Sequence, residues 1–407
     1  MTLKSNTIKK SPDDLAIFGG KPSFETDLHV GRPNIGDRSR FLSYTNDIFD
    51  RHWLTNQGHY VHEFEKRIAN IIGVKHCIAV CNATIGLEIA IRGCGLIGEV
   101  ILPSMTFIAT AHALQWQGIV PIFCDINPET HNIDPVKIET LITPRTTGII
   151  GVHLWGRPCN IEALSEIAEI HNLKIIYDAA HAFYCSHDAR MIGCFGEAEI
   201  FSFHATKFIN TFEGGAIVTN NDTLAEKFRL MRNFGFSDID KVISIGTNGK
   251  MNEISAAMGL ASLKSLDEFI AINYRNYKLY QLELSGIPGL TLISYNEYEK
   301  NNYQYIILEF NETIADITRD QIVEILWNEK VLARRYFYPG CHGMEPYRTI
   351  YPNTGSRLPE TEKMVRRLIA LPTGTGVSLN DIRHICQIIR FVILNGNKIR
   401  QRLIANS

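Results

Sequence analysis

Short apolar runs alternate with longer amphipathic stretches from about residue 75 to residue 219. The runs are rich in β-branched residues and are bounded by polar ones, as buried strands are. They read HCIAVC, EVILP, VPIFCD, TGIIGV, KIIYD and EIFSF. Between them lie segments with helical periodicity, such as TIGLEIAIRGCG and NIEALSEIAEIHN. This repetition predicts an α/β fold, in which a largely parallel sheet is covered by helices.

One apolar run departs from this alternation. GGAIVTN follows EIFSF after a connection too short for a helical crossover. Parallel neighbours need a crossover of about a dozen residues or more, whereas antiparallel neighbours do not. We therefore expect one strand of opposite direction, and hence a mixed sheet.

The pattern changes after Leu260. A long helical stretch, ASLKSLDEFIAINYRNYKLYQLEL, gives way to the strand-like YQYIILEF, the helical RDQIVEILWNEK and a closing helix at LNDIRHICQIIRFVI. This order suits a smaller α+β domain, and a chain of 407 residues is long enough for two cores. We predict an N-terminal surface segment over residues 1–30, a large domain over 31–266 and a small C-terminal domain over 267–407.

Charge and composition argue against several classes of protein. The formal charge is −2, and no basic stripe is interleaved with aromatic residues, so nucleic acid is not an expected partner. No apolar run approaches the roughly 20 residues of a membrane span, and no signal-peptide pattern is present. The nine cysteines are scattered singly, as buried thiols are. We expect a soluble cytoplasmic protein without a membrane partner.

Two motifs carry little functional weight. Gly93, Gly95 and Gly98 match the dinucleotide fingerprint G-x-G-x-x-G, but they follow a helix and precede a strand, the reverse of its context. We interpret them as a helix C-cap and turn. The fourteen histidines include no H-E-x-x-H motif, and Cys77 and Cys81 lack a second pair at zinc-ligand spacing. No metal site is predicted.

Asp178 ends the apolar strand in IIYDAAHA. Open α/β sheets present their ligand groups at this end of their strands. A carboxylate there can pair with a buried cation, such as a protonated pyridine nitrogen. Alternatively, it only caps the next helix, as Asp residues commonly do.

Lys207 lies in SFHATK, after another apolar strand and shortly before Gly214 and Gly215. Burial lowers the pKa of a lysine and frees the neutral amine, which condenses with aldehydes. A single lysine is ordinarily a solvated surface residue. Its spacing after Asp178 favours the functional interpretation.

The segment Cys81-Asn-Ala-Thr84 leads from a strand directly into an apolar helix. Backbone N–H groups and the Thr84 hydroxyl can meet a phosphate there, at the positive end of the helix dipole. As a plain N-cap, Thr84 would produce the same pattern. The phosphate interpretation therefore depends on Lys207 and Asp178 lying nearby.

Together these residues resemble the sugar aminotransferases of the DegT/DnrJ/EryC/StrS type, a branch of the fold-type I pyridoxal-phosphate enzymes. The resemblance runs over nearly the whole chain, through GGKP, WLTN, DAAHA, SFHATK, EGGAIVT and RYFYPGCH. It implies a mostly parallel, mixed seven-stranded sheet in the large domain. It also implies pyridoxal 5'-phosphate as cofactor, a nucleotide-sugar substrate, an amino-acid donor and a homodimer with shared active sites.

The resemblance also assigns roles residue by residue. Lys207 corresponds to the catalytic Schiff-base lysine, Asp178 to the partner of the ring nitrogen, and His181 to the residue beside the phenolic oxygen of the cofactor. Phe107 is similar to the aromatic residue that stacks on the ring. The implied phosphate contacts are Ala83, Thr84 and Ser202 from the same chain and Asn252 from a partner subunit. Tyr338 and His342 resemble substrate-side residues, and otherwise form a polar turn.

Within the family, the strings CNAT, FHATKFINTFEGG, GTNGKMNE and ALPTGT are most similar to enzymes that aminate C4 of dTDP-4-keto-6-deoxyglucose. The resemblance then implies glutamate as donor and a 4-amino-4,6-dideoxy sugar as product. Three alternatives stay open: amination of a 3-keto sugar nucleotide, cofactor-dependent 3-dehydration, and a catalytically silent protein that keeps the fold. The dehydratases carry histidine in place of the cofactor lysine, so Lys207 argues against that reaction.

Overall fold

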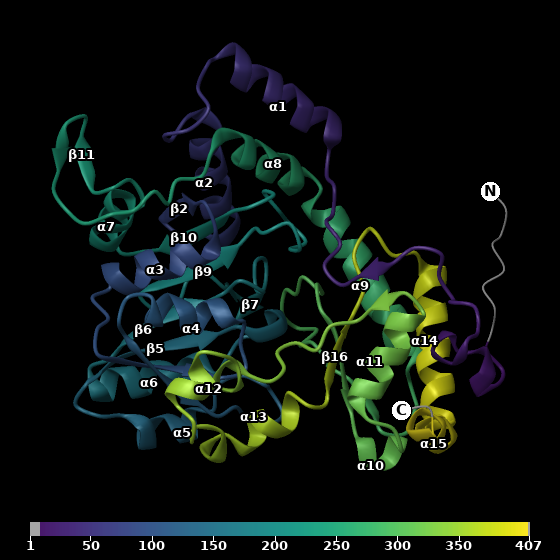
Figure 1. The fold of residues 1–407 in the computed structure, drawn as a ribbon. Helices are drawn as coiled ribbons and strands as arrows, with labels where there is room; N and C mark the ends of the chain where they lie inside the picture. The colour runs from purple at the N-terminus through teal and green to yellow at the C-terminus, as the bar shows by residue number, and fades with distance from the viewer. Residues whose placement is uncertain (1–8, 406–407) are drawn as a thin grey trace.

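The centre of the molecule is a seven-stranded sheet in the order β2, β10, β9, β6, β5, β3 and β4 (Figure 1). The computed structural model describes residues 9–405, so residues 1–8 of the predicted N-terminal segment lie outside the described range. The strands are β2 (His76–Val80), β3 (Glu99–Pro103), β4 (Val120–Cys124), β5 (Thr146–Val152), β6 (Lys174–Asp178), β9 (Ala198–Ser202) and β10 (Gly215–Thr219).

Strand β10 is antiparallel to both of its neighbours, β2 and β9. The pairs β3–β4, β3–β5, β5–β6 and β6–β9 are all parallel. The structure therefore confirms a mixed, mostly parallel sheet, with GGAIVTN as the strand of opposite direction. The connection from β9 to β10 is too short to contain a crossover helix, so β10 runs antiparallel to β9.

Helices cover both faces of this sheet. Alternate residues of each strand point to opposite faces, so Ile78 and Val80 pack on one side and Cys77 and Ala79 on the other. The first face carries α3 (Ala83–Gly93), α4 (Ile108–Gln115) and α7 (Asp222–Arg232). The second carries α2 (His59–Ile72), α6 (Ile161–His171) and α8 (Glu253–Lys264).

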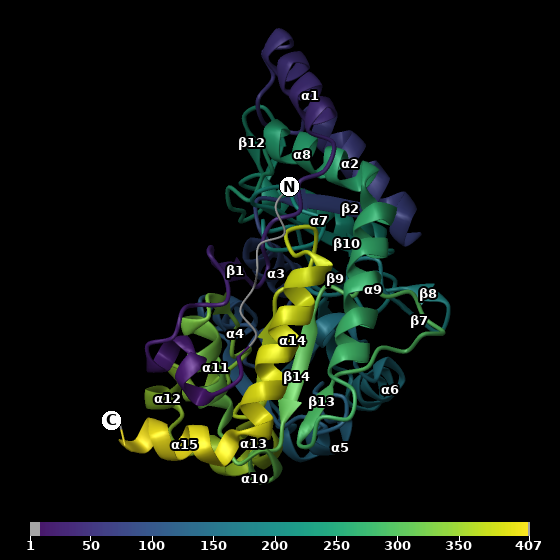
Figure 2. The same ribbon diagram turned by 90° about the vertical axis from the view of Figure 1, so that its right-hand side faces the viewer.

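The C-terminal part has its own sheet and core. Strands β13 (Leu290–Leu292), β14 (Ile306–Phe310) and β16 (Leu368–Leu371) are antiparallel. Helices α9 (Leu266–Glu283) and α14 (Leu379–Leu394) run beside β14 (Figure 2), and α11 (Arg319–Asn328) packs in the same core. This is the predicted smaller α+β arrangement. The residue bounds 31–266 and 267–407 stay predictions.

The described part of the N-terminal segment joins the C-terminal core. Strand β1 (Leu28–His29) pairs with β15 (Val331–Leu332), and the side chains of Leu15 and Phe24 are buried there. Lys9 forms an ion pair with the buried Glu329 at 2.9 Å. The sequence predicted a surface segment over residues 1–30 and did not predict these buried contacts.

The remaining elements are mostly short. The helices are α1 (Arg38–Asp50), α5 (Pro135–Ile138), α10 (Glu312–Ala315), α12 (Tyr347–Ile350), α13 (Pro359–Met364) and α15 (Gly396–Ala405). Two small hairpins consist of β7 (Ser186–His187) with β8 (Arg190–Met191), and β11 (Phe236–Asp238) with β12 (Lys241–Val242). Within residues 9–405, no helix combines the length and the apolar character needed to cross a lipid bilayer.

The glycine-rich segment after α3 forms the predicted turn. Helix α3 ends at Gly93, and Gly95 and Gly98 have φ angles of 76° and 63°. Left-handed glycines are common where a helix ends. The segment is therefore a helix C-cap and turn, and it does not begin a helix as a dinucleotide site would.

Candidate active site

A cavity of about 390 Å³ lies at the carboxyl ends of β5, β6 and β9. Its walls also include the N-terminus of α3, the loop before α4 and residues of the C-terminal part. The structure places seven of the predicted site residues in this wall: Ala83, Thr84, Phe107, Asp178, His181, Ser202 and Lys207. Segments that are far apart in the sequence thus meet in one place, as strand ends do in open α/β sheets.

Lys207 follows β9 and reaches toward the C-terminal part. Its Nζ donates a hydrogen bond to the hydroxyl of Tyr305 at 3.0 Å. Burial of the ammonium group lowers the pKa of Lys207 to about 8, while the carboxylate of Asp178 acts in the opposite direction. About a tenth of the Lys207 side chains are therefore the neutral amine at pH 7, the form that attacks an aldehyde, and this fraction is far larger than for an ordinary lysine.

Asp178 is the last residue of β6, and its side chain is buried. One carboxylate oxygen accepts a hydrogen bond from the Thr110 hydroxyl at 2.8 Å, and the other accepts one from the N–H of Ala180 at 3.1 Å. Burial raises the pKa of this carboxyl, and the two hydrogen bonds oppose that effect. A cation in the cavity would stabilise the ionised form, so Asp178 fits a protonated ring nitrogen.

His181 is buried between aromatic rings. Its ring is stacked with those of Trp155 and Phe337, at interplanar angles of 17° and 16°. The backbone N–H of Trp155 donates to Nδ1 of His181 at 3.3 Å, which assigns the ring proton to Nε2. Burial and the charge of Lys207 lower the pKa of His181 well below its usual value. His181 is therefore a neutral hydrogen-bond donor, which fits a place beside a phenolic oxygen.

The N-terminus of α3 fits a phosphate group. The side chain of Asn82 caps the helix by accepting the N–H of Ile85 at 2.9 Å, so the N–H groups of Ala83 and Thr84 need another acceptor. A Cβ on Gly215 would lie 2.8 Å from the nitrogen of Ala83, so only glycine lets α3 approach β10 this closely. The hydroxyl-bearing Thr84 and Ser202 complete this cradle.

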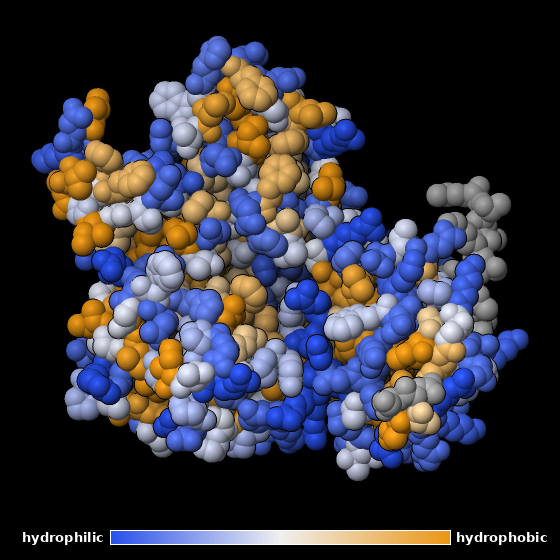
Figure 3. Space-filling model, viewed as in Figure 1, coloured by the Kyte–Doolittle hydropathy of each residue, from blue (hydrophilic) through white to orange (hydrophobic). Residues whose placement is uncertain are grey.

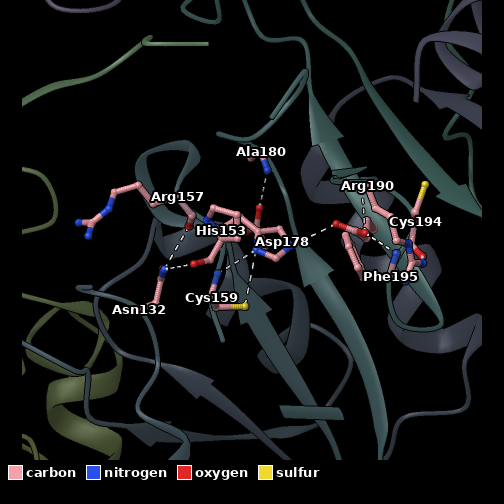
Figure 4. A network of polar contacts seen from close by, with 12 residues as sticks. Asn132, His153, Arg157, Cys159, Asp178, Ala180, Arg190, Cys194 and Phe195 are labelled. Carbon is pink, nitrogen blue, oxygen red and sulfur yellow. Dashed lines mark hydrogen bonds and ion pairs between the residues drawn. The ribbon is translucent and has the colours of Figure 1, made fainter. Parts of the chain in front are cut away.

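A buried polar network supports the strand end that carries Asp178 (Figure 4). The N–H of His153 donates to the carbonyl oxygen of Asp178 at 3.1 Å. On the ring, Nε2 lies 3.2 Å from a carboxylate oxygen of Glu199, and Nδ1 accepts the N–H of Cys159 at 3.2 Å. The other Glu199 oxygen accepts two N–H groups of the 193–195 turn. The network joins the carboxyl ends of β5 and β6 to the beginning of β9.

Sequence reasoning missed several residues of the cavity. The most informative are Tyr305, which contacts Lys207, and Thr110, which contacts Asp178. Both lie in segments with recognisable patterns, the strand YQYIILEF and the helix IATAHALQ, but no local spacing relates them to their partners. Other lining residues that were missed are Thr106, His204, Gln304, Arg334, Tyr336 and Phe337.

Three predicted site residues do not line this cavity. Asn252 caps α8 on the surface. His342 is buried, with Nδ1 at 2.6 Å from the hydroxyl of Ser104 and Nε2 at 2.8 Å from the carboxylate of Glu362. Tyr338 lines a second cavity instead. The roles of these three residues stay predictions.

The second cavity has a volume of about 510 Å³ and adjoins the first. The two cavities share four lining residues: Phe107, Arg334, Tyr336 and Phe337. The guanidinium of Arg335 lies over the rings of Trp327 and Tyr338, at 5.4 and 5.6 Å, and forms an ion pair with Asp320 at 3.1 Å. Aromatic faces and a cation therefore line an extension of the site.

Comparison with known proteins agrees with this geometry. Residues 36–390 match the DegT/DnrJ/EryC1/StrS aminotransferase family. The dTDP-4-amino-4,6-dideoxy-D-glucose transaminase of Shigella dysenteriae is 36% identical over 90% of this chain and 99% of that enzyme. The GDP-perosamine synthase of Caulobacter vibrioides is 36% identical over 79% of this chain and 86% of its own length.

Two solved structures share the fold over most of the chain. The crystal structure of DesI with its TDP-sugar product has a TM-score of 0.91 and 45% sequence identity, and it covers 96% of this chain and 99% of DesI. Helicobacter pylori PseC, an aminotransferase of pseudoaminic acid biosynthesis, has a TM-score of 0.84 and 26% identity, over 90% of this chain and 99% of PseC. These matches confirm the fold class that the sequence predicts.

Proposed function

Because the chain belongs to the DegT/DnrJ/EryC1/StrS aminotransferase family, whose cofactor is pyridoxal phosphate, we propose that it aminates a nucleotide-linked 4-keto-6-deoxyhexose. The proposed substrate is dTDP-4-keto-6-deoxyglucose, the donor is glutamate, and the product is the 4-amino-4,6-dideoxy sugar. The observation that carries the proposal is the meeting of Lys207 and Asp178 in one cavity beside the N-terminus of α3.

Each part of this cavity has a task in the reaction. Bound pyridoxal phosphate supplies an electron sink for the carbanion formed at the donor α-carbon. Lys207, with a pKa of about 8, holds and releases the proton at that carbon. With the cofactor bound, the carboxylate of Asp178 would balance the positive charge of the ring nitrogen, and His181 would donate a hydrogen bond from Nε2 to the phenolic oxygen. The hydroxyl of Tyr305 keeps Nζ inside the cavity.

The second cavity supports a substrate larger than an amino acid. Its aromatic rings provide faces on which a nucleobase can stack, and Arg335 adds a positive charge. We place the nucleoside there and the sugar in the first cavity, where the keto carbon meets Lys207. Tyr338 then lies on the nucleoside side, in keeping with its predicted role at the substrate.

We also propose that the enzyme is a homodimer whose partner subunit completes the cofactor site. Apolar side chains crowd two exposed surfaces (Figure 3), on and after α1 and along the β11–β12 hairpin and its flanks. They are Leu42, Phe49, Trp53 and Leu54 on the first surface and Phe234, Phe236, Ile239, Val242, Ile243 and Ile245 on the second. Exposed apolar surface of this kind favours association. Asn252, the predicted phosphate contact from the partner subunit, follows the second surface in the chain.

Two measurements test the dimer. Light scattering on the purified protein is expected to give twice the chain mass of 46.0 kDa, and Ile239→Asp is expected to lower that mass. Asn252→Ala is expected to weaken cofactor binding by about tenfold, because one charge-assisted hydrogen bond to the phosphate is lost. A fully active monomer, or cofactor affinity unchanged in Asn252→Ala, contradicts a shared site.

The substrate is tested by product analysis. The cofactor-loaded enzyme is incubated with glutamate and dTDP-4-keto-6-deoxyglucose, and the product is identified by mass spectrometry and NMR. A 4-amino sugar is expected, with parallel double-reciprocal plots, because donor and acceptor react in turn. A 3-amino product, a dehydrated sugar or unchanged sugar contradicts the assignment.

A GDP-linked sugar is a second candidate acceptor. The similarity to the GDP-perosamine synthase of Caulobacter vibrioides, 36% identity over 79% of this chain, favours including it. A parallel incubation with a GDP-linked 4-keto-6-deoxyhexose distinguishes the two, since the better substrate has the higher kcat/KM. A higher kcat/KM for the GDP-linked sugar would assign the nucleotide as GDP instead of dTDP.

A further inference from the structure

Arg334 lies at the junction of the two cavities, because its side chain lines both. Its backbone is fixed to β16 by two hydrogen bonds with Ala370, of 3.0 and 2.8 Å. Its guanidinium lies 5.4 Å from the centre of the Tyr336 ring. The residue thus presents a charged group from a fixed point of the backbone to the passage between the cavities.

The charge of Arg334 has no carboxylate to balance it within residues 9–405: none of the ion pairs found there includes this residue. The adjacent Arg335 differs, because it pairs with Asp320 at 3.1 Å. Apart from Arg334, the ionisable residues in the wall of the first cavity are two acids, two histidines, two tyrosines and one lysine: Asp178, Glu213, His181, His204, Tyr305, Tyr336 and Lys207. The charge of Lys207 is lost as the pH rises through its pKa of about 8. Arg334 is the one side chain in that wall with a permanent positive charge.

We propose that Arg334 is a shared anion receptor, which binds a carboxylate of the amino-acid donor in one half-reaction and the diphosphate of the nucleotide sugar in the other. The inference rests on the proposed function and adds to it a single binding residue for both substrates. A guanidinium presents five N–H donors in one plane and forms paired hydrogen bonds with carboxylates and phosphates alike.

The position of Arg334 suits both ligands. A donor amino acid reacts in the first cavity, so its carboxylate approaches Arg334 from the side of Lys207. A nucleotide sugar spans both cavities, and its diphosphate joins the sugar to the nucleoside, so this group lies at the junction. Glu213 is an acidic residue in the wall of the first cavity, and the charge of Arg334 offsets its repulsion of either anion.

A shared receptor makes binding of the two anions mutually exclusive. A nucleoside diphosphate without a sugar has no group that reaches the cofactor. A small dicarboxylate does not fill the second cavity. The two ligands would therefore compete only if they share a binding residue. If each had its own receptor, the two would bind together. If both need Arg334, each displaces the other.

Calorimetric titration of the pyridoxal-phosphate-loaded enzyme tests this exclusion. The probes are dTDP and 2-oxoglutarate, the keto acid of the proposed donor, which does not transaminate with the aldehyde form of the cofactor. The apparent Kd of dTDP is expected to rise in proportion to the concentration of 2-oxoglutarate. A Kd that does not change at saturating 2-oxoglutarate overturns the shared receptor.

Substitution of the arginine provides the second test. Arg334→Gln is expected to weaken binding of both probes by about 10- to 100-fold, the effect of losing charge-assisted hydrogen bonds. Arg334→Lys keeps the charge but not the paired donors. Its affinity for both probes is expected to lie between the affinities of the unmodified enzyme and of Arg334→Gln. The proposal is contradicted if Arg334→Gln loses affinity for only one of the probes, or if its affinity for both probes is unchanged.

A control variant separates the effect of losing Arg334 from the general effect of removing an arginine. Arg383 lies on α14 and is close to Glu283 at 3.6 Å, outside both cavities. Arg383→Gln is expected to bind both probes like the unmodified enzyme, and equal melting temperatures show that both variants fold. Wild-type protein that binds no nucleotide at all would refute the proposed function. Wild-type protein that binds both probes independently would refute only the shared receptor.

Discussion

The Nζ atom of Lys207 lies 3.0 Å from the hydroxyl oxygen of Tyr305, across the cavity between the two parts of the molecule. Lys207 follows β9 of the large sheet, whereas Tyr305 immediately precedes β14 of the small one. Burial raises the pKa of Tyr305 well above its usual value, so the phenol stays neutral. The contact therefore couples the position of the amine to the packing of the C-terminal part.

Replacing Tyr305 with phenylalanine is expected to lower kcat by about tenfold, because Nζ loses the hydrogen bond that orients it. Single-turnover measurements with glutamate should show the loss in the proton-transfer half-reaction. Tyr303→Phe, two residues away and outside the cavity wall, is the matched control and should keep its rate. An unchanged rate in Tyr305→Phe would mean that the contact does not position the amine.

The pKa of Lys207 predicts how cofactor loading depends on pH. The neutral amine attacks the aldehyde, and its fraction rises through the pKa of about 8 instead of the usual value near 10.5. The rate at which cofactor-free protein takes up pyridoxal phosphate should therefore increase between about pH 7 and 9 and level off above it. Stopped-flow absorbance checks this, and a rate still rising steeply above about pH 9 would contradict it.

Thr110 is expected to set the acid limit of activity. Its hydroxyl donates to the Asp178 carboxylate at 2.8 Å and lowers the pKa of that carboxyl, against the effect of burial. Thr110→Val removes the donor, so the pKa of Asp178 should rise. The acidic limb of the profile of kcat/KM against pH should move to higher pH, because the carboxylate must be ionised. Thr110→Ser should restore the original profile.

The pair formed by His153 and Glu199 is expected to matter for stability. Both side chains are fully buried, so removing one partner leaves an uncompensated polar group. Glu199→Leu should lower the free energy of unfolding by about 3–5 kcal/mol, measured by urea denaturation. Glu197→Leu is the control, because its pair with Lys174 is solvated and contributes less than about 1 kcal/mol. Equal losses in the two variants would contradict a special role for the buried pair.

The sequence by itself determined the large sheet and the centre of the site. Strand and helix periodicities are local, and parallel strands joined by crossovers end at the same edge of a sheet. Asp178 ends one such strand and Lys207 follows another, so their meeting could be predicted from strand ends alone. The antiparallel direction of β10 followed from the length of one connection. The cradle at Thr84 followed from a strand that leads directly into a helix.

Only the tertiary structure decided which residues of the C-terminal part enter the site. Tyr305 and Arg334 lie 98 and 127 residues after Lys207, and no periodicity fixes the docking of one sheet against another. The same packing turned His342 toward Ser104 and Glu362, away from the cavity. Local pattern sets which face of an element is buried, but contacts between distant elements depend on side-chain packing along the whole interface.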